Sequence, residues 1–161
     1  MGDKILDLKN ITKWYGGVQA LNKVDFTVAK SEIHCLVGEN GSGKSTLIKI
    51  ISGVVQPEAG AEIIVEGEKI KKMSSELSLN KGIQVIYQDL SLFPNLTVAE
   101  NIAIYLHQRK GVGIVNWKEI KSIAESALAK IDIDFELEKK VSILSIADRQ
   151  LVAITRELAL A

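Results

Sequence analysis

The sequence predicts an α/β protein in which a strand-rich half, residues 1–88, precedes a helix-rich half, residues 89–161. Two observations support this division. Apolar residues alternate or run together in short segments of the first half, and they recur at helical spacing in the second half. A glycine-rich stretch, residues 38–45, also lies between an apolar run and a helical segment. Strand, loop and helix in this order are typical of α/β folds.

Alternating segments near the N-terminus predict half-buried strands. Ile5–Asn10 and Val24–Val28 each place apolar side chains at every second position. The Gly16–Gly17 pair between them predicts a turn. Further along, Glu62–Ile70 predicts two short strands joined by a turn at Gly67.

Two other runs predict strands that are covered on both faces. Ile33–Val37 and Gly82–Gln88 are almost continuously apolar, as buried strands are. Residues 46–52 form a helical stretch after the glycine-rich loop, with Gly53 as its C-terminal cap. A short helix is expected over Ser75–Asn80.

The second half contains signals for three longer helices. Thr97–Glu100 is a capping box that opens a helix expected to run to about His107, and the Gly111–Gly113 segment breaks it. The segment Asn116–Glu119 has the same capping pattern and is expected to begin the next helix. The last helix occupies much of Leu144–Ala161 and carries an apolar face.

Composition excludes several classes of protein. The 47% of hydrophobic and 25% of charged residues are typical of a globular chain rather than a disordered one. Twenty basic residues balance twenty acidic ones, so no overall field favours nucleic acid. A single cysteine cannot form an internal disulfide. The N-terminus lacks the apolar stretch of a signal peptide and no run is long enough for a membrane span, so any membrane association is expected to involve a partner.

The glycine-rich loop is the strongest functional signal. "GENGSGKS", residues 38–45, matches the pattern G-x-x-x-x-G-K-[ST] of a phosphate-binding loop. Glycines let backbone N–H groups curl around a phosphate, and the helix that follows directs its positive end at the same anion. Lys44 then reaches the β- and γ-phosphates, and the Ser45 hydroxyl binds Mg²⁺. The loop alone leaves the reaction open, because kinases, GTPases, motor ATPases and transporters all use it.

The residues around the loop resemble a particular family. The run "WYGGVQALNKVDFTVAKSEIHCLVGENGSGKST" and the stretches "GIQVIYQDLSLFPNLTVAENI" and "VSILSIADRQ" are similar, in this order, to the ATPase subunits of ABC transporters. The similarity extends over essentially the whole chain and is greatest to the sugar importers of the ribose, galactose and xylose type. It implies an α/β P-loop NTPase core with an antiparallel β subdomain and a helical subdomain.

The resemblance also implies roles for individual residues. Tyr15 occupies the position of the aromatic residue that stacks on adenine, with Val18 and Ala20 near the base edge. Gln88 matches the glutamine of the Q-loop, which contacts Mg²⁺ and the attacking water. Lys44 and Gln88 are thus the expected catalytic residues, and Ser45 and Gln88 the expected metal ligands. The expected nucleotide-binding residues are Tyr15, Gly38, Glu39, Asn40, Gly41, Ser42, Gly43, Lys44, Ser45 and Thr46.

The segment "LSIAD" stands where the family usually has the signature L-S-G-G-Q, which closes on the ATP of an opposing ATPase domain. Ser145 is retained, but Ile146 and Ala147 replace both glycines and Asp148 replaces the glutamine. Two Cβ atoms restrict the backbone's approach to a phosphate. The carboxylate of Asp148 satisfies the helix dipole and repels a phosphate. We therefore expect the ATP site that this segment completes to be slow or to bind without turnover.

The resemblance implies ATP and Mg²⁺ as cofactors and a place at the cytoplasmic face of the cell membrane. The implied partners are a second ATPase domain (in the same chain or in a homodimer), membrane permease subunits and, indirectly, a solute-binding protein. Phe93, Pro94 and Leu96 are candidates for the surface that receives the permease, although ordinary packing explains them equally well. No nucleic-acid partner is expected.

We expect the chain to be the N-terminal part of a first ATPase domain, with the rest of that domain missing. In the family the last helix leads into the Walker B strand, whose Asp-Glu pair orders Mg²⁺ and water. Strands left without those partners would have unpaired edges and uncovered apolar faces. The chain by itself is expected to hydrolyse little ATP. Two alternatives stay open: a P-loop kinase or phosphotransferase, and a catalytically silent ATPase-like regulatory module.

Overall fold

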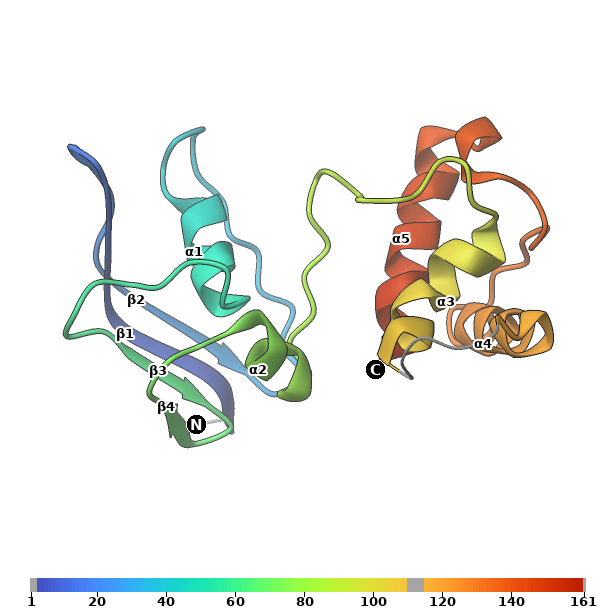
Figure 1. The fold of residues 1–161 in the computed structure, drawn as a ribbon. Helices are drawn as coiled ribbons and strands as arrows, with labels where there is room; N and C mark the ends of the chain where they lie inside the picture. Colours follow the sequence, from blue (N-terminus) through green and yellow to red (C-terminus); the bar gives the residue numbers. More distant parts are fainter. Residues whose placement is uncertain (1–2, 110–114, 161) are drawn as a thin grey trace. The chain divides into compact units, whose positions relative to one another are not determined.

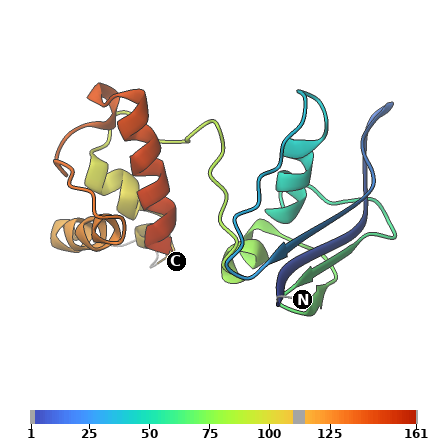
Figure 2. The same ribbon diagram turned by 180° about the vertical axis from the view of Figure 1, so that it is seen from behind.

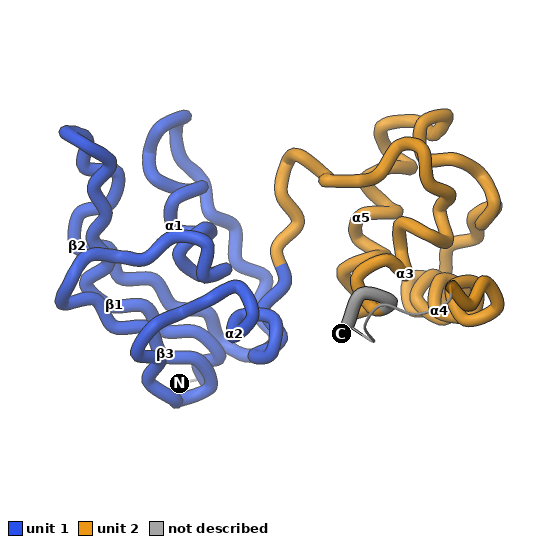
Figure 3. Tube along the Cα trace, in the orientation of Figure 1, with its two compact units in different colours: residues 1–84 blue, residues 85–161 orange. Residues whose placement is uncertain are grey.

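The computed structural model describes residues 3–109 and 115–160. The chain divides into two compact units, residues 1–84 (unit 1) and residues 85–161 (unit 2), which Figure 3 distinguishes by colour. Each unit has its own cluster of buried apolar side chains.

A four-stranded antiparallel sheet forms the base of unit 1 (Figure 1). Its spatial order is β2-β1-β3-β4. Two-residue turns join β1 to β2 at Gly16–Gly17 and β3 to β4 at Glu66–Gly67, and the second residue of the latter turn has φ +80°. Both turns lie where the sequence predicts them. The strands are β1 (Lys4–Tyr15), β2 (Val18–Ala29), β3 (Glu62–Val65) and β4 (Glu68–Ile70).

Helix α1 (Lys44–Ile51) covers one face of this sheet (Figures 1 and 2). Leu8 of β1 lies opposite Ile63 of β3, and both are buried in the same cluster as Ile50 of α1. This packing places the N-terminus of α1 at one end of the sheet. The short helix α2 (Ser75–Asn80) begins where the Ser74 hydroxyl accepts a bond from the Leu77 amide at 3.1 Å.

Unit 2 is helical in its described residues. Its elements are α3 (Val98–Arg109), α4 (Trp117–Ala129), a single 3₁₀ turn η1 (Val141–Ile143) and α5 (Ile146–Leu160). Apolar residues from the three α-helices form one cluster, in which Ile102, Ala124 and Val152 are almost completely buried. No helix in the described part of the chain is both long and apolar enough to cross a bilayer.

The helix starts in unit 2 follow the capping signals. The Thr97 amide donates to the Glu100 carboxylate at 2.7 Å, and the Glu100 amide donates to the Thr97 hydroxyl at 3.2 Å, which confirms the capping box. The Asn116 side chain accepts from the Glu119 amide at 3.3 Å. Helix α3 extends two residues beyond the expected end at His107. The expected break at Gly111–Gly113 lies outside the described residues.

Two predicted strands do not form. No residue of Ile33–Val37 or Gly82–Gln88 belongs to a strand of the sheet. Ile33 is 95% exposed and Val37 86% exposed, which is the opposite of the predicted burial. The physical reason is that a strand needs a paired neighbour, and the four-stranded sheet of the described residues includes neither segment. An apolar run indicates that a segment is suited to a buried strand, but the neighbouring strand with which it would pair must come from another part of the chain.

Candidate nucleotide-phosphate site

The glycine-rich loop packs directly on strand β2. Gly43 has φ +91°, in the region that favours glycine. A Cβ atom at this position would lie 2.5 Å from the Ala20 carbonyl oxygen and 2.7 Å from the Leu21 side chain. Only glycine therefore fits between β2 and the start of α1.

Lys44 closes the loop from within. It is the first residue of α1, and its ammonium group donates to the carbonyl oxygens of Gly38 at 2.7 Å and Glu39 at 2.6 Å, and to the Ser42 hydroxyl at 3.3 Å. All three acceptors belong to the loop itself. The lysine charge is thus held over the loop's concave side, where phosphate oxygens can replace these acceptors.

No side chain caps the N-terminus of α1. Its N-cap residue is Gly43, which makes no side-chain cap, and no acidic residue lies in the first turn. The positive end of the helix is therefore not neutralised locally. A hollow of about 200 Å³ adjoins it, lined by Gly38, Ser42 and Lys44 on the polar side and by Leu21 and Leu36 among its apolar residues. Free helix charge, a lysine and a glycine backbone fit a nucleotide phosphate, and the exposed Ser45 on the same helix turn fits a magnesium ligand.

Tyr15 lies at the tip of the β1–β2 hairpin, which points to the same end of unit 1 as the glycine-rich loop (Figures 1 and 2). Tyr15 is 44% exposed, and the Lys13 ammonium lies 5.8 Å from the centroid of its ring. The Glu58 carboxylate accepts from the Trp14 amide and pairs with Lys13, both at 3.3 Å. These two contacts, the amide first, lower the pKa of Glu58 below its ordinary value. The hairpin tip is therefore fixed while the tyrosine ring stays accessible.

The remaining expected site residues belong to unit 2. Gln88 is exposed and lies in the irregular segment between the two units' regular elements. Ser145 precedes α5, where its hydroxyl accepts from the Asp148 amide at 3.1 Å and donates to the Asp148 carboxylate at 2.8 Å. Ile146 is 77% exposed. The expected site thus divides into a phosphate loop in unit 1 and a glutamine and signature segment in unit 2.

Two polar residues in the core of unit 2 were not predicted from the sequence. Asn101 is fully buried and Arg156 is 5% exposed. Both bind main-chain atoms of the loop that follows Gln88. The only sequence signal was a polar side chain at a position of an otherwise apolar helical face, and such a residue can equally lie at the surface.

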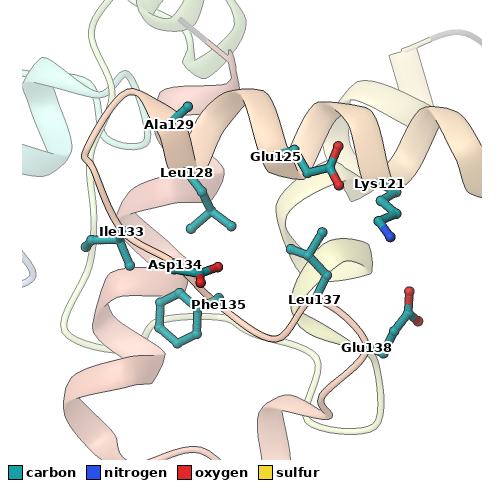
Figure 4. A pocket seen from close by; sticks show the side chains of 9 residues that line it. All are labelled: Lys121, Glu125, Leu128, Ala129, Ile133, Asp134, Phe135, Leu137 and Glu138. Atoms are coloured by element: carbon teal, nitrogen blue, oxygen red, sulfur yellow. The ribbon is translucent and has the colours of Figure 1, made fainter.

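A separate hollow in unit 2 lies between α4 and the segment 133–138 (Figure 4). Its volume is about 410 Å³, with Leu128 and Leu137 facing into it and charged side chains such as Lys121 and Glu138 at its margin. Its lining includes no hydroxyl, thiol or imidazole group. It also lacks a glycine-rich phosphate loop, and the candidate nucleotide site is therefore the one in unit 1.

A glycine-rich loop that wraps a lysine at the start of a helix defines the P-loop class of nucleotide-binding proteins. Within that class the sequence is specific. The profile of the ABC transporter family matches residues 21–161, and the chain belongs to this family.

Curated relatives include proteins named as import ATP-binding proteins for ribose and for arabinose. The chain is 43% identical over 155 residues to a "Ribose import ATP-binding protein RbsA 1" of Burkholderia ambifaria, covering 94% of this chain and 30% of the relative. It is 44% identical over 155 residues to an "Arabinose import ATP-binding protein AraG" of Rhizobium johnstonii, and this match covers 96% of this chain and 30% of the relative. The chain therefore spans less than a third of the length of these relatives.

Solved structures of ATP-binding cassettes have the same fold. A nucleotide-free cassette from an ABC transporter superposes with a TM-score of 0.83 at 27% identity, covering 98% of this chain and 65% of that one. A cassette solved in its ADP conformation superposes with a TM-score of 0.82 at 27% identity, covering 98% of this chain and 65% of that one. A bacterial cassette solved as a dimer gives 0.75 at 30% identity, covering 96% and 69%. The expected fold, a P-loop core with an antiparallel sheet and a helical part, is confirmed.

Proposed function

We propose that this chain is the ATP- and Mg²⁺-binding part of the ATPase of a sugar importer. The parent ATPase binds and hydrolyses ATP and couples this to carbohydrate uptake through a membrane permease. Support comes from the family match and from the ribose and arabinose importers among the relatives. The same family match favours an ATPase over a P-loop kinase.

The contacts of Lys44 are the observation on which the proposal depends most. Among the described residues, its ammonium group bonds to acceptors within its own loop, at the uncapped start of a helix. A triphosphate offers the same three donors anionic oxygens instead of neutral ones, so that each contact becomes an attraction between opposite charges. ATP binding should therefore displace the loop's own acceptors.

Each site residue has a role in this proposal. Backbone amides of residues 38–46 and Lys44 hold the β- and γ-phosphates. Ser45 and Gln88 are the protein ligands of Mg²⁺, which neutralises phosphate charge when it is bound. Gln88 also orients the attacking water, and Tyr15 stacks on adenine with its accessible ring.

The partners follow from the same proposal. A second ATPase domain completes the site with its own residues, and a relative of known structure is a dimeric cassette. Phe93 is 44% exposed and Pro94 is exposed next to it, which supports docking of a permease at residues 93–96. The protein would then lie at the cytoplasmic face of the membrane and meet the solute-binding protein only through the permease.

A direct binding measurement tests the nucleotide site. Titration of the chain with a fluorescent ATP analogue should show saturable binding that excess ATP displaces and EDTA weakens. The matched control is the Lys44→Ala variant. No saturable binding by the unmodified chain would contradict the proposal.

A second candidate function is nucleotide binding without turnover at the site that the signature segment completes. The mutual bonds of Ser145 and Asp148 favour it, because they occupy the groups that would hold a phosphate. Replacing Ile146 and Ala147 by glycine and Asp148 by glutamine in the full-length ATPase should raise its turnover. An unchanged rate would contradict this second proposal.

A further inference from the structure

Arg156 of α5 holds the main chain of the loop that follows Gln88. One terminal nitrogen of its guanidinium donates to the Ser91 carbonyl oxygen and the other to the Leu90 carbonyl oxygen, both at 2.9 Å. The third nitrogen, Nε, donates to a Glu157 carboxylate oxygen at 3.2 Å. The side chain is almost completely buried, so this fork is a specific arrangement rather than a surface contact.

An aromatic ring from a second helix supports the same guanidinium. The Arg156 Cζ atom lies 5.0 Å from the centroid of the Tyr105 ring on α3. A cation held over a ring face at this distance is stabilised by the ring's quadrupole. Arg156 therefore ties together α5, α3 and the carbonyl groups of Leu90 and Ser91.

Asn101 of α3 forms a second attachment a few residues further along the loop. Its amide oxygen accepts from the Phe93 amide at 2.8 Å, and its nitrogen donates to the carbonyl oxygens of Phe93 at 3.0 Å and Thr97 at 2.9 Å. The side chain is fully buried and uses three of its four hydrogen-bonding positions in these contacts. Residues 90–97 are thus attached to the helices at both ends.

We propose that Arg156 and Asn101 are positioning residues for Gln88. Unit 2 begins at residue 85, and the attachments begin two residues after Gln88. Any movement of α3 and α5 is therefore transmitted to Gln88 with only Asp89 between it and the first attached carbonyl. The inference rests on the role proposed above for Gln88, and it adds the residues that set the position of that side chain.

Amide hydrogen exchange tests the attachments without requiring activity. Arg156→Lys keeps a buried positive charge but cannot reproduce the two-nitrogen fork, and Asn101→Ala removes the second attachment. Exchange at residues 90–97 should accelerate on the order of tenfold in each variant. The matched control is Arg149→Lys, because Arg149 lies on the same helix and donates to Ser142 instead of the loop.

Turnover by the full-length ATPase tests whether the attachments act through Gln88. Arg156→Lys should lower kcat on the order of tenfold while KM changes less than about twofold. In a Gln88→Ala background the same substitution should cause no further loss of kcat. A merely structural role would lower kcat by a similar factor in both backgrounds.

The possible failures are distinguishable. If the unmodified protein does not bind the ATP analogue, the proposed function is wrong whatever the exchange data show. If it binds the analogue but exchange at residues 90–97 is the same in Arg156→Lys and Arg149→Lys, the attachments are wrong. The positioning role is wrong if Arg156→Lys accelerates exchange but leaves kcat unchanged. It is also wrong if Arg156→Lys lowers kcat by the same factor with Gln88 and with Gln88→Ala.

Discussion

Two helix N-termini in this chain carry residues expected to meet phosphate, and they are built in opposite ways. Helix α1 starts after Gly43, with no side-chain cap and no acid in its first turn. Helix α5 starts after Ser145, whose hydroxyl caps the Asp148 amide, and Asp148 itself lies in the first turn. One terminus leaves its positive end to a ligand, and the other neutralises it with its own side chains.

The two termini therefore differ in what they offer to a phosphate. At α1 a lysine is held over a glycine backbone, and its neutral acceptors are easily replaced by anionic ones. At α5 the carboxylate of Asp148 already accepts from the Ser145 hydroxyl at 2.8 Å. A phosphate that binds at the start of α5 must therefore displace the Asp148 carboxylate, which is part of the helix itself. Substitutions at the two helix starts test this comparison, and the largest effect is expected at Lys44.

Lys44→Ala should weaken ATP binding by about 10- to 100-fold, because it removes a charge-assisted contact of about 1.5–3 kcal/mol. The measurement is the fluorescent-nucleotide titration. Lys49→Ala is the control, since Lys49 is an exposed residue in the last turn of the same helix. Equal losses in the two variants would mean that net charge, not the loop, governs binding.

Gly43→Ala should destabilise unit 1 by roughly 1–3 kcal/mol, because the added Cβ meets the Ala20 carbonyl and the backbone is in a conformation that alanine disfavours. Chemical denaturation followed by Trp14 fluorescence in a Trp117→Phe background reports on this unit alone. Gly41→Ala is the control. Gly41 also has a positive φ but has no atom within 4 Å of the added Cβ, so its loss should be smaller.

Ser145→Ala should destabilise unit 2 by about 1 kcal/mol, the usual loss for an N-cap. Trp117 fluorescence in a Trp14→Phe background measures it. ATP binding to the chain should stay unchanged, because the cap does not contribute to the loop in unit 1. Ser142→Ala, an exposed position just before the cap, serves as the control. A parallel loss of nucleotide affinity would contradict the division between the two termini.

Acidification should produce the smallest effect, and it should appear in unit 1. The Lys4 ammonium and the Thr27 hydroxyl, in that order, lower the pKa of Asp7 below its ordinary value of 3.8. A carboxyl group whose pKa is lower in the folded than in the unfolded state stabilises the fold at pH values above its unfolded-state pKa. This stabilisation is lost as the pH falls through the folded-state pKa. The ion pair with Lys4 is exposed to solvent, so only a small decrease is expected below about pH 4. Asp7→Asn should reduce the decrease, measured by Trp14 fluorescence between about pH 6 and pH 3; an identical decrease would assign it to other groups.

Local signals in the sequence were reliable wherever neighbouring residues decide the structure. The Gly16–Gly17 turn, the capping box of Thr97 and Glu100 and the cap at Asn116 all form as predicted. Each depends on backbone conformation and hydrogen bonds within a few residues. The phosphate loop belongs to the same category, because its lysine bonds to residues five and six positions away.

Signals that depend on distant partners were less informative. Ile33–Val37 has the composition of a buried strand but is exposed, since pairing is a property of two segments and the sequence of one does not specify the other. Arg156 and Asn101 show the converse case. Polar residues on helical faces suggest exposed positions, yet Arg156 is buried on carbonyl groups that lie 65 and 66 residues away. Asn101 has nearer partners, the carbonyl groups of Phe93 and Thr97, but its burial depends on the packing of α3 in unit 2.

The sequence by itself determined the phosphate loop, the hairpins, the helix starts and the family, because each is encoded by residue types at short spacing. Only the tertiary structure decided which predicted strands pair and which polar side chains enter the core. It also decided that the loop after Gln88 is attached to α3 and α5. Strand pairing needs a second segment, and burial of a polar side chain is favourable only where folding supplies hydrogen-bond partners that replace water.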